Sequence, residues 1–371
     1  MSALPDPRVF PTPTSAVALE LTKAAEESLA APIMQQKDSL DARIREVWAE
    51  LARGGAFAEL AEVFRQSPSV AVSRHWWRRL EEALRANASQ AEGVATQVFA
   101  LPLVIVVGAG AAAKLSGVVP EIDKIVSLLQ EHGALRGNRN FALGNALVSP
   151  EKLAIGELGA LLRQGVDPMA LPLAPMEIEP KHESVFLRFL IGAAVAAPGA
   201  DLFGAQELGR WGMPLAQELA RQLSATGVTV LVLPRAPAGL LSAAHQGRQA
   251  QREVALQLFA SNAIRKMRSG VGEPTAVLST HRVGEGGGEL RVSLSSPFDP
   301  RSAEGFCIPL EPLDRVADVA QTVVDLLRDC RVTDLRMLTQ VQPDRDALTG
   351  GPLLFKPENI GPNEVVAYRA D

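Results

Sequence analysis

The chain has 371 residues, which is long enough for two domains that each bury a hydrophobic core. Hydrophobic residues make up 47% and charged residues 21%, values that argue against a disordered chain and against a multi-span membrane protein. A formal net charge of -5 gives no long-range attraction for nucleic acid or anionic lipid, so we expect neither as a partner.

The cysteines and the first residues bear on the cellular compartment. Cys307 and Cys330 are too few for a disulfide framework and lack the CxxC spacing of zinc and redox sites. The N-terminus, MSALPDPRVFPTPTS, has proline where a signal peptide needs an apolar segment, so we interpret residues 1–14 as a disordered arm. We therefore expect a cytoplasmic protein.

Residues 15–163 are predicted to form a mostly helical domain. Its clearest helix has apolar residues at i, i+4, i+7 and i+11, a start that Asp38 or Ser39 could cap, and an end at Gly54. Further helices are expected from residue 120 to 132 and from 150 to 162, with the loop RGNRNFALGN (136–145) between them. The apolar positions of the first three helices are Leu40, Ile44, Val47 and Leu51; Phe57, Leu60 and Phe64; and Trp76, Leu80 and Leu84.

The uncharged residues 93–113 allow three interpretations. They are long enough to cross a bilayer as a helix. Gly108, Gly110 and Ala113 match the GxGxxG/A spacing that brings a backbone close to a dinucleotide, which makes the two glycines candidate cofactor-binding residues. The β-branched run before Gly108 instead favours a short buried strand near 103–107, and the early break at Ser116-Gly117 speaks against a Rossmann helix. We favour the strand.

Residues 164–181 contain four prolines and no helical period, so they predict a domain linker. We expect residues 182–342 to form an α/β domain with a mixed sheet, a parallel crossover and a β-hairpin around Gly284–Gly288. Residues 343–371 form an irregular tail that crosses to the other domain or to another subunit. The expected strands are 184–196, 228–233, 275–283, 289–296, 306–310 and 334–341, and the helices 206–225, 238–268 and 314–331. The overall class is α/β or α+β.

A candidate ligand pocket follows from the rule that open α/β sheets bind ligands beyond the carboxyl ends of parallel strands. Arg235 follows one expected strand and Asp344 follows another. On the helix between them, His245 and Arg248 lie on one face, with Arg252 one turn further along. Arg235, His245, Arg248 and Asp344 are therefore our candidate pocket for an anionic small molecule.

No catalytic constellation stands out. The five histidines lack the HxH and HxxxH spacings of metal sites, and the sequence has no GxSxG nucleophile motif. We therefore interpret the chain as a two-domain binding or assembly protein that joins a homo-oligomer or another protein. The alternative is an enzyme or sensor that binds a nucleotide or carboxylate in the candidate pocket, and a membrane-attached component is a third class. We assign no metal site, and the sequence does not identify a cofactor.

Overall fold

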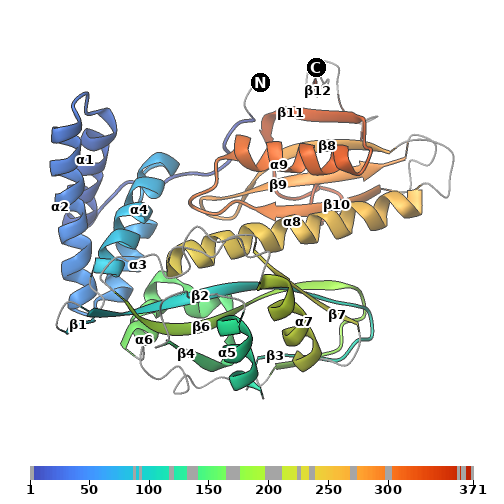
Figure 1. Cartoon of the computed structure of the whole chain (residues 1–371). Coiled ribbons are helices and arrows are strands. Elements are labelled where there is room, and N and C mark those ends of the chain that lie inside the picture. The colour runs from blue at the N-terminus through green and yellow to red at the C-terminus, as the bar shows by residue number, and fades with distance from the viewer. Residues whose placement is uncertain are drawn as a thin grey trace. The chain divides into compact units, whose positions relative to one another are not determined.

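The structure is a computed structural model with a mixed α/β fold, shown in Figure 1. It describes residues 4–86, 89–91, 94–116, 121–131, 141–163, 176–196, 211–223, 227–233, 239–267, 274–296, 303–356, 360 and 365–368. By their contacts the residues form two compact units. The N-terminal unit comprises 14–65 and 74–251, and the C-terminal unit comprises 1–13, 66–73 and 252–371.

The elements have the following bounds. The helices are α1 (Ala16–Ala30), α2 (Met34–Arg53), α3 (Phe57–Arg65), α4 (Val70–Ala86), α5 (Ile122–Glu131), α6 (Leu158–Arg163), α7 (Gly212–Leu223), α8 (Leu240–Met267) and α9 (Val316–Asp329). The strands are β1 (Ser89–Ala91), β2 (Val94–Val107), β3 (Ala113–Ser116), β4 (Phe141–Val148), β5 (Met176–Ile178), β6 (Ser184–Ala196), β7 (Val228–Val232), β8 (Thr275–Val283), β9 (Gly287–Ser295), β10 (Ala303–Pro309), β11 (Asp334–Gln342) and β12 (Val365–Tyr368).

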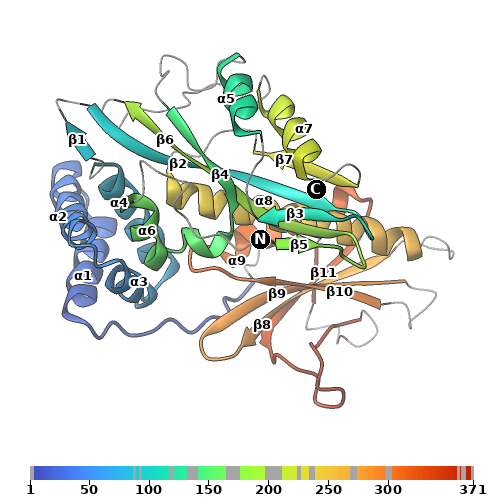
Figure 2. The same cartoon turned by 90° about the horizontal axis from the view of Figure 1, so that it is seen from below.

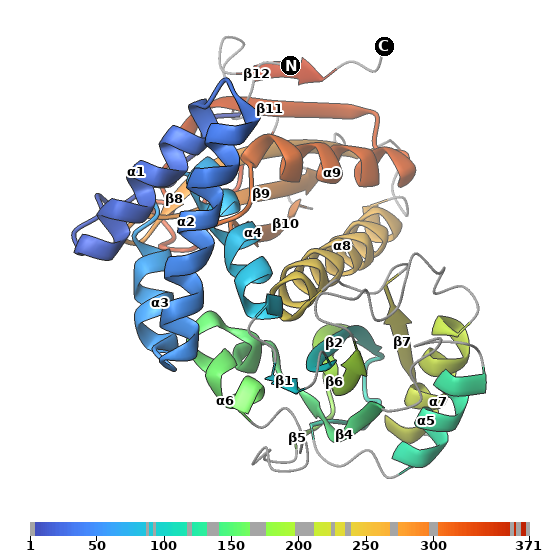
Figure 3. The ribbon, with the colours of Figure 1, turned by 60° about the vertical axis from the view of Figure 1, so that its left-hand side comes forward.

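Helices α1 to α4 confirm the helical prediction for the first part of the chain, and α1 and α2 pack side by side (Figure 3). The predicted cap of α2 was wrong. The helix begins at Met34, and Ser39 lies inside it, where its hydroxyl donates to the carbonyl of Gln35 at 3.0 Å. Apolar contacts outweigh the missing cap, because α2 buries Ile44 and Trp48, and the Trp48 ring meets that of Trp76 edge-on at 5.9 Å.

Within the stretch 93–113, which allowed three interpretations, residues 94–107 form strand β2, which is longer than the expected strand near 103–107. It pairs antiparallel with β6 on one side and with β7 on the other. Strands β6 and β7 therefore run in the same direction with α7 between them in the chain, as the predicted crossover requires, but β2 separates them. No helix among the described residues is long and apolar enough to cross a membrane, and the membrane-helix interpretation of 93–113 is wrong.

The sheet of the N-terminal unit has a helix layer on each face. Alternate β2 residues such as Leu103 and Ile105 point into a core closed by α5 and α7, which lie side by side in Figure 2. The first half of α8 covers the opposite face through Gly247, where an added Cβ would lie 2.9 Å from Pro102 Cβ. Glycine is needed there because the helix approaches the sheet so closely.

Several expectations for the middle of the chain were wrong. Residues 141–148, expected to be partly loop, form edge strand β4. The helix expected over 150–162 is two 3-10 turns (Pro150–Leu153 and Ile155–Glu157) followed by the short α6. Most of the predicted linker, 164–175, lies outside the described residues, and its end forms β5, which pairs with β3. Because β2 pairs with β6 across that segment, the two compact units do not divide there.

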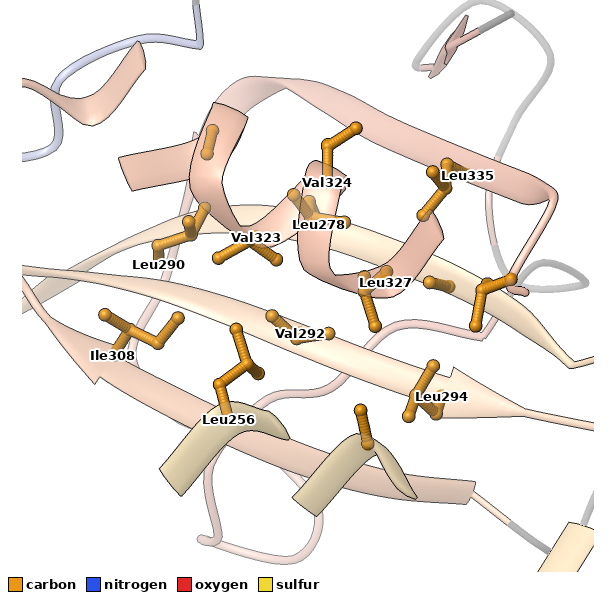
Figure 4. Close-up of a cluster of buried hydrophobic side chains, with 14 of the residues drawn as sticks. Leu256, Leu278, Leu290, Val292, Leu294, Ile308, Val323, Val324, Leu327 and Leu335 are labelled. Atoms are coloured by element: carbon orange, nitrogen blue, oxygen red, sulfur yellow. The ribbon is translucent and has the colours of Figure 1, made fainter. Parts of the chain in front are cut away.

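The C-terminal unit confirms the predicted mixed sheet and hairpin. Its strand order is β10-β9-β8-β11-β12, with β8 and β11 parallel and the other pairs antiparallel. Gly284 and Gly286 adopt positive φ in the β8–β9 turn. Helix α9 and the second half of α8 pack on one face of the sheet and bury it (Figure 4). The tail is less irregular than expected, because it returns as β12.

The N-terminal arm is ordered where the structure describes it. Residues 4–13 contain no helix or strand, yet Leu4 and Pro7 are buried and Arg8 contacts residues more than 300 positions away in the sequence. The expectation of a disordered arm is therefore replaced, for these residues, by a segment docked within the C-terminal unit.

Candidate binding site

A buried polar surface lies on the face of the C-terminal sheet opposite to its hydrophobic core. Side chains alternate along a strand, so Leu278 and Leu290 point into the core while Ser279, His281 and Arg291 share the other face. All three polar side chains are almost completely buried: Ser279 and His281 have 0% exposure, and Arg291 has 1%. Buried polar groups need partners, and here the residues after β11 provide them.

His281 joins the sheet to the segment that follows β11. Its Nε2 lies 2.8 Å from the Ser279 hydroxyl, and its Nδ1 lies 2.7 Å from the carbonyl oxygen of Pro343. Burial lowers the pKa of His281, and the Pro343 hydrogen bond opposes this shift only in part. The imidazole is therefore neutral near pH 7 and acts as a two-ended hydrogen-bonding group.

Arg291 is the central group of the site. Its Nε donates to Glu289 Oε2 at 2.9 Å, and Nη2 donates to the carboxylate of Asp344. Its Nη1 donates to the carbonyl oxygens of Asp344 and Leu353, the latter at 3.3 Å. Two carboxylates balance the buried guanidinium charge, and two carbonyls use its remaining donors. Arg291 thereby fixes both ends of the segment between Asp344 and Leu353.

That segment, residues 343–353, is a compact turn that we call the C-terminal hairpin. Arg345 and Pro352 form an antiparallel bridge, and the Arg345 guanidinium donates to the carbonyl of Gly350 at 2.8 Å. The carboxylate of Asp346 accepts the amides of Leu348 and Thr349, both at 2.8 Å, and these bonds lower its pKa. Gly350 supplies the positive φ that closes the turn.

Leu348 projects from the tip of this hairpin into solvent. Its relative exposure is 96%, the largest among the exposed large hydrophobic residues of the described chain. Beyond the hairpin, Leu354 packs on Gly305, where an added Cβ would lie 2.2 Å from its Cδ1. The ring of Phe355 lies 6.1 Å from that of His281. An exposed leucine thus stands on a turn that is held firmly at its base.

The same cluster includes groups that can look catalytic. Ser279, His281 and the Pro343 carbonyl are spaced like a nucleophile, a base and a group that orients the base. However, the serine and the histidine are inaccessible to solvent, so no substrate reaches the hydroxyl in this conformation. Burial also raises the pKa of the neighbouring Cys307 thiol, which disfavours the reactive thiolate. The geometry supports binding better than catalysis.

The structure places the predicted pocket residues in different surroundings. Asp344 lies beyond the carboxyl ends of the parallel strands β8 and β11, as expected, and its partner there is Arg291. His245 and Arg248 are half-buried on α8 in the N-terminal unit, and the His245 ring lies 5.8 Å from that of Trp77. Arg235 lies outside the described residues. Arg252, which follows Arg248 on the same helix, pairs with Asp314 at 2.7 Å in the C-terminal unit.

The loop of Gly108 and Gly110 uses its amides within the protein. The Gly108 amide donates to the carbonyl of Gly227 and the Gly110 amide to that of Pro180, both at 2.8 Å. The Ala111 amide donates back to Gly108 at 3.1 Å. The chain then continues as strand β3, so the loop does not open the helix that a dinucleotide site requires.

A separate open groove of about 1000 Å³ lies between α8 and α9 in the C-terminal unit. Glu253, Asp325 and Asp329 line it together with Arg265 and Arg331. Because acidic and basic side chains are mixed along its walls, the groove does not favour a ligand of one charge.

Neither Arg291 nor Leu348 was among the site residues predicted from the sequence. In GGELRVSLS the alternation already puts Arg291 on one face with two serines, and DALTGG is typical of a turn with an exposed tip.

In the part of the chain that the structure describes, no three His, Cys, Asp or Glu side chains are placed to hold a metal ion. Comparisons with family models, with characterised proteins and with solved structures found no match to this chain.

Proposed function

We propose that this chain acts by binding a partner protein through its C-terminal hairpin, with Leu348 as the anchoring side chain. The observation that carries the proposal is the 96% exposure of Leu348 on a turn held by its own hydrogen bonds. Exposing a leucine costs hydrophobic free energy, and burial against a partner would recover roughly 1.5–3 kcal/mol. This proposal keeps the interpretation of a binding or assembly protein and assigns the binding to one element.

Preorganisation supports the same proposal. A loop that must become ordered on binding loses affinity through conformational entropy. Here Arg291 holds the base of the hairpin, and Asp346 holds its tip through two amides. The hairpin would therefore bind with little further ordering.

The surroundings of Leu348 define the partner surface that it fits. Arg345 and Asp346 carry opposite charges close to the tip, and neither forms an apolar surface around it. The matching surface is a small apolar pocket with a polar rim of mixed charge, because rim charges contribute mainly to orientation.

The test compares the partner proteins that are retained by immobilised full-length wild type, Leu348→Ser and Met213→Ser. We expect Leu348→Ser to lose a partner that the wild type retains, because the anchor is removed without changing the hydrogen bonds of the hairpin. Met213→Ser, which removes an exposed methionine from α7, is the matched control and should retain that partner. Identical partner sets for all three proteins would contradict the proposal, provided that circular dichroism shows equal folding.

A second candidate function keeps the anionic-ligand hypothesis and moves it to Arg291. Asp344 supplies a carboxylate to a buried guanidinium at the carboxyl ends of β8 and β11, the place where α/β sheets bind ligands. A free carboxylate or phosphate could occupy the same position when Asp344 leaves. In Asp344→Ala, acetate or phosphate should raise the melting temperature by several degrees more than in the wild type. Equal shifts in the two proteins would exclude this candidate.

A further inference from the structure

The N-terminal arm, residues 4–10, is bound within the C-terminal unit in the way that a separate peptide would be. Leu4 is only 8% exposed and belongs to the hydrophobic core cluster that contains Leu256 and Val316. Pro7 packs against Gly288, where an added Cβ would lie 2.7 Å from Pro7 Cγ. The arm therefore fills a site for apolar side chains that the glycine leaves open.

Arg8 makes the most specific contacts of the arm. Its guanidinium donates to the carbonyl oxygens of Glu311 and Asp314, the latter at 2.6 Å, just before α9 begins. Asp6, two residues earlier in the arm, accepts from the same guanidinium at 2.6 Å and keeps it oriented. Arginine suits this place because its several donors lie in one fixed plane.

Backbone hydrogen bonds complete the recognition. The Val9 amide donates to the carbonyl of Gly286 at 3.3 Å, and Arg282 Nε donates to the carbonyl of Pro7 at 3.2 Å. An added Cβ on Gly286 would lie 3.0 Å from the Val9 carbonyl oxygen. The glycine-rich turn between β8 and β9 thus lets an extended chain approach closely. We call the residues that hold the arm, namely Arg282, Gly286, Gly288, Glu311 and Asp314, the arm-binding surface.

We infer that the arm-binding surface is a peptide-binding site that accepts this arm from a second copy of the chain as well as from its own. The hydrogen bonds from the arm to the arm-binding surface join residues that are 275 or more positions apart, and residues 4–13 form no helix or strand of their own. An arm from a second copy can make the same contacts, which is the condition for exchange between identical chains. The prolines at 5, 7, 11 and 13 restrict the free arm and lower the entropy lost on binding.

The first experiment measures how tightly a peptide with the sequence of the arm binds to the arm-binding surface. A labelled peptide of residues 2–13 is titrated into full-length Arg8→Ala protein, whose own arm is weakened while the arm-binding surface is unchanged. We expect the wild-type peptide to bind about tenfold or more tightly than an Arg8→Ala peptide, because charge-assisted hydrogen bonds are lost in the latter. Equal affinity of the two peptides would overturn the inference. If Arg8→Ala does not fold, full-length Val9→Pro replaces it, because that change removes the amide that donates to Gly286 and also restricts the backbone of Arg8, so it weakens the arm and leaves the arm-binding surface unchanged.

The second experiment tests exchange between copies by complementation. Gly288→Val places a side chain where Pro7 binds, so this variant has a blocked arm-binding surface and a normal arm. Arg8→Ala has a normal arm-binding surface and an arm that binds more weakly. We expect light scattering to show a heterodimer in an equimolar mixture of these two full-length proteins and none in either protein alone. The double variant Arg8→Ala/Gly288→Val, mixed with Arg8→Ala, is the control and should stay monomeric. A mixture without heterodimer, while circular dichroism shows folded proteins, would overturn exchange.

Discussion

The carboxylate of Glu81 on α4 lies against the first turn of α8, where its Oε2 accepts the amide hydrogen of Ser242 at 3.0 Å. Burial raises the pKa of Glu81 to about 7, although the nearby Arg85 and the amides of the α8 first turn act in the opposite direction. Glu81 of α4 thus supplies a hydrogen-bond acceptor to the positive N-terminal end of α8. The unfavourable side of this arrangement is that an ionisable carboxyl group is buried.

This pKa predicts how stability depends on pH. A raised folded-state pKa stabilises the fold below the ordinary value of 4.5, and this contribution is lost as the pH rises through about 7. We expect Glu81→Gln to gain stability relative to the wild type by up to about 3 kcal/mol between about pH 5 and pH 9. Urea unfolding across that range measures the difference. Glu46→Gln, at an exposed site on α2, should show no such trend, and parallel curves for wild type and Glu81→Gln would refute the prediction.

Gly239 leaves the space that the Glu81 carboxylate occupies. An added Cβ at Gly239 would lie 1.6 Å from Glu81 Oε1, a distance that forces the carboxylate to move. We expect Gly239→Ala to lower the free energy of unfolding by about 1–3 kcal/mol. In a Glu81→Ala background the same change should cost much less, because the clash is absent. A double-mutant cycle by urea unfolding tests this, and purely additive effects would show that the two residues do not interact.

The sequence predicted elements that have strong periodic patterns, such as α2, α9 and the β8–β9 hairpin. It failed at β4, where Gly144 and Asn145 suggest a turn and the pairing with β6 shifts register between Leu143 and Leu147. A register shift of this kind breaks the alternation that identifies a strand. The place of β2 between β6 and β7 depends on contacts distant in sequence, which local patterns do not contain.

For the candidate site, the rule about strand ends pointed to Asp344. The residues predicted to lie beside Asp344 were charged residues of a helix, whereas its partner in the structure is Arg291 of strand β9. Charged residues with helical spacing drew attention to Arg248, whereas Arg291 sits in a strand between apolar residues. Its partners are two carboxylates and two backbone carbonyls, and the carbonyls of Asp344 and Leu353 lie 53 and 62 positions away in the sequence. The alternation of β9 indicates the face on which Arg291 lies, but backbone carbonyls carry no residue identity, so the sequence does not reveal which of them it binds.

A buried polar cluster joins α1, α2 and α4 in the N-terminal unit. Asp41 lies 2.6 Å from the Ser28 hydroxyl, 2.9 Å from His75 Nε2 and 2.6 Å from Arg79 Nη2. Removing its charge breaks the buried ion pair with Arg79 and leaves that guanidinium with Glu82, 2.7 Å from Nη1, as its remaining carboxylate. We therefore expect Asp41→Asn to destabilise the protein by about 2 kcal/mol. Chemical denaturation measures this loss. Asp38→Asn, on the exposed side of the same helix, should change stability little, and equal losses from both variants would contradict the assignment.

Arg331, which follows α9, is the one non-glycine residue with positive φ in the described chain, at 64°. Its amide donates to the carbonyl of Arg328 at 2.7 Å and the Val332 amide to that of Leu327 at 2.9 Å, so a left-handed residue is needed to end the helix. Glycine adopts this conformation without the strain of a side chain, although it costs more backbone entropy. We expect Arg331→Gly to raise the free energy of unfolding by about 0.5–1 kcal/mol, measured by urea unfolding. Arg331→Ala removes the same charge but keeps Cβ, so it should give no gain; equal stability of the two variants would show that backbone strain is not the cause.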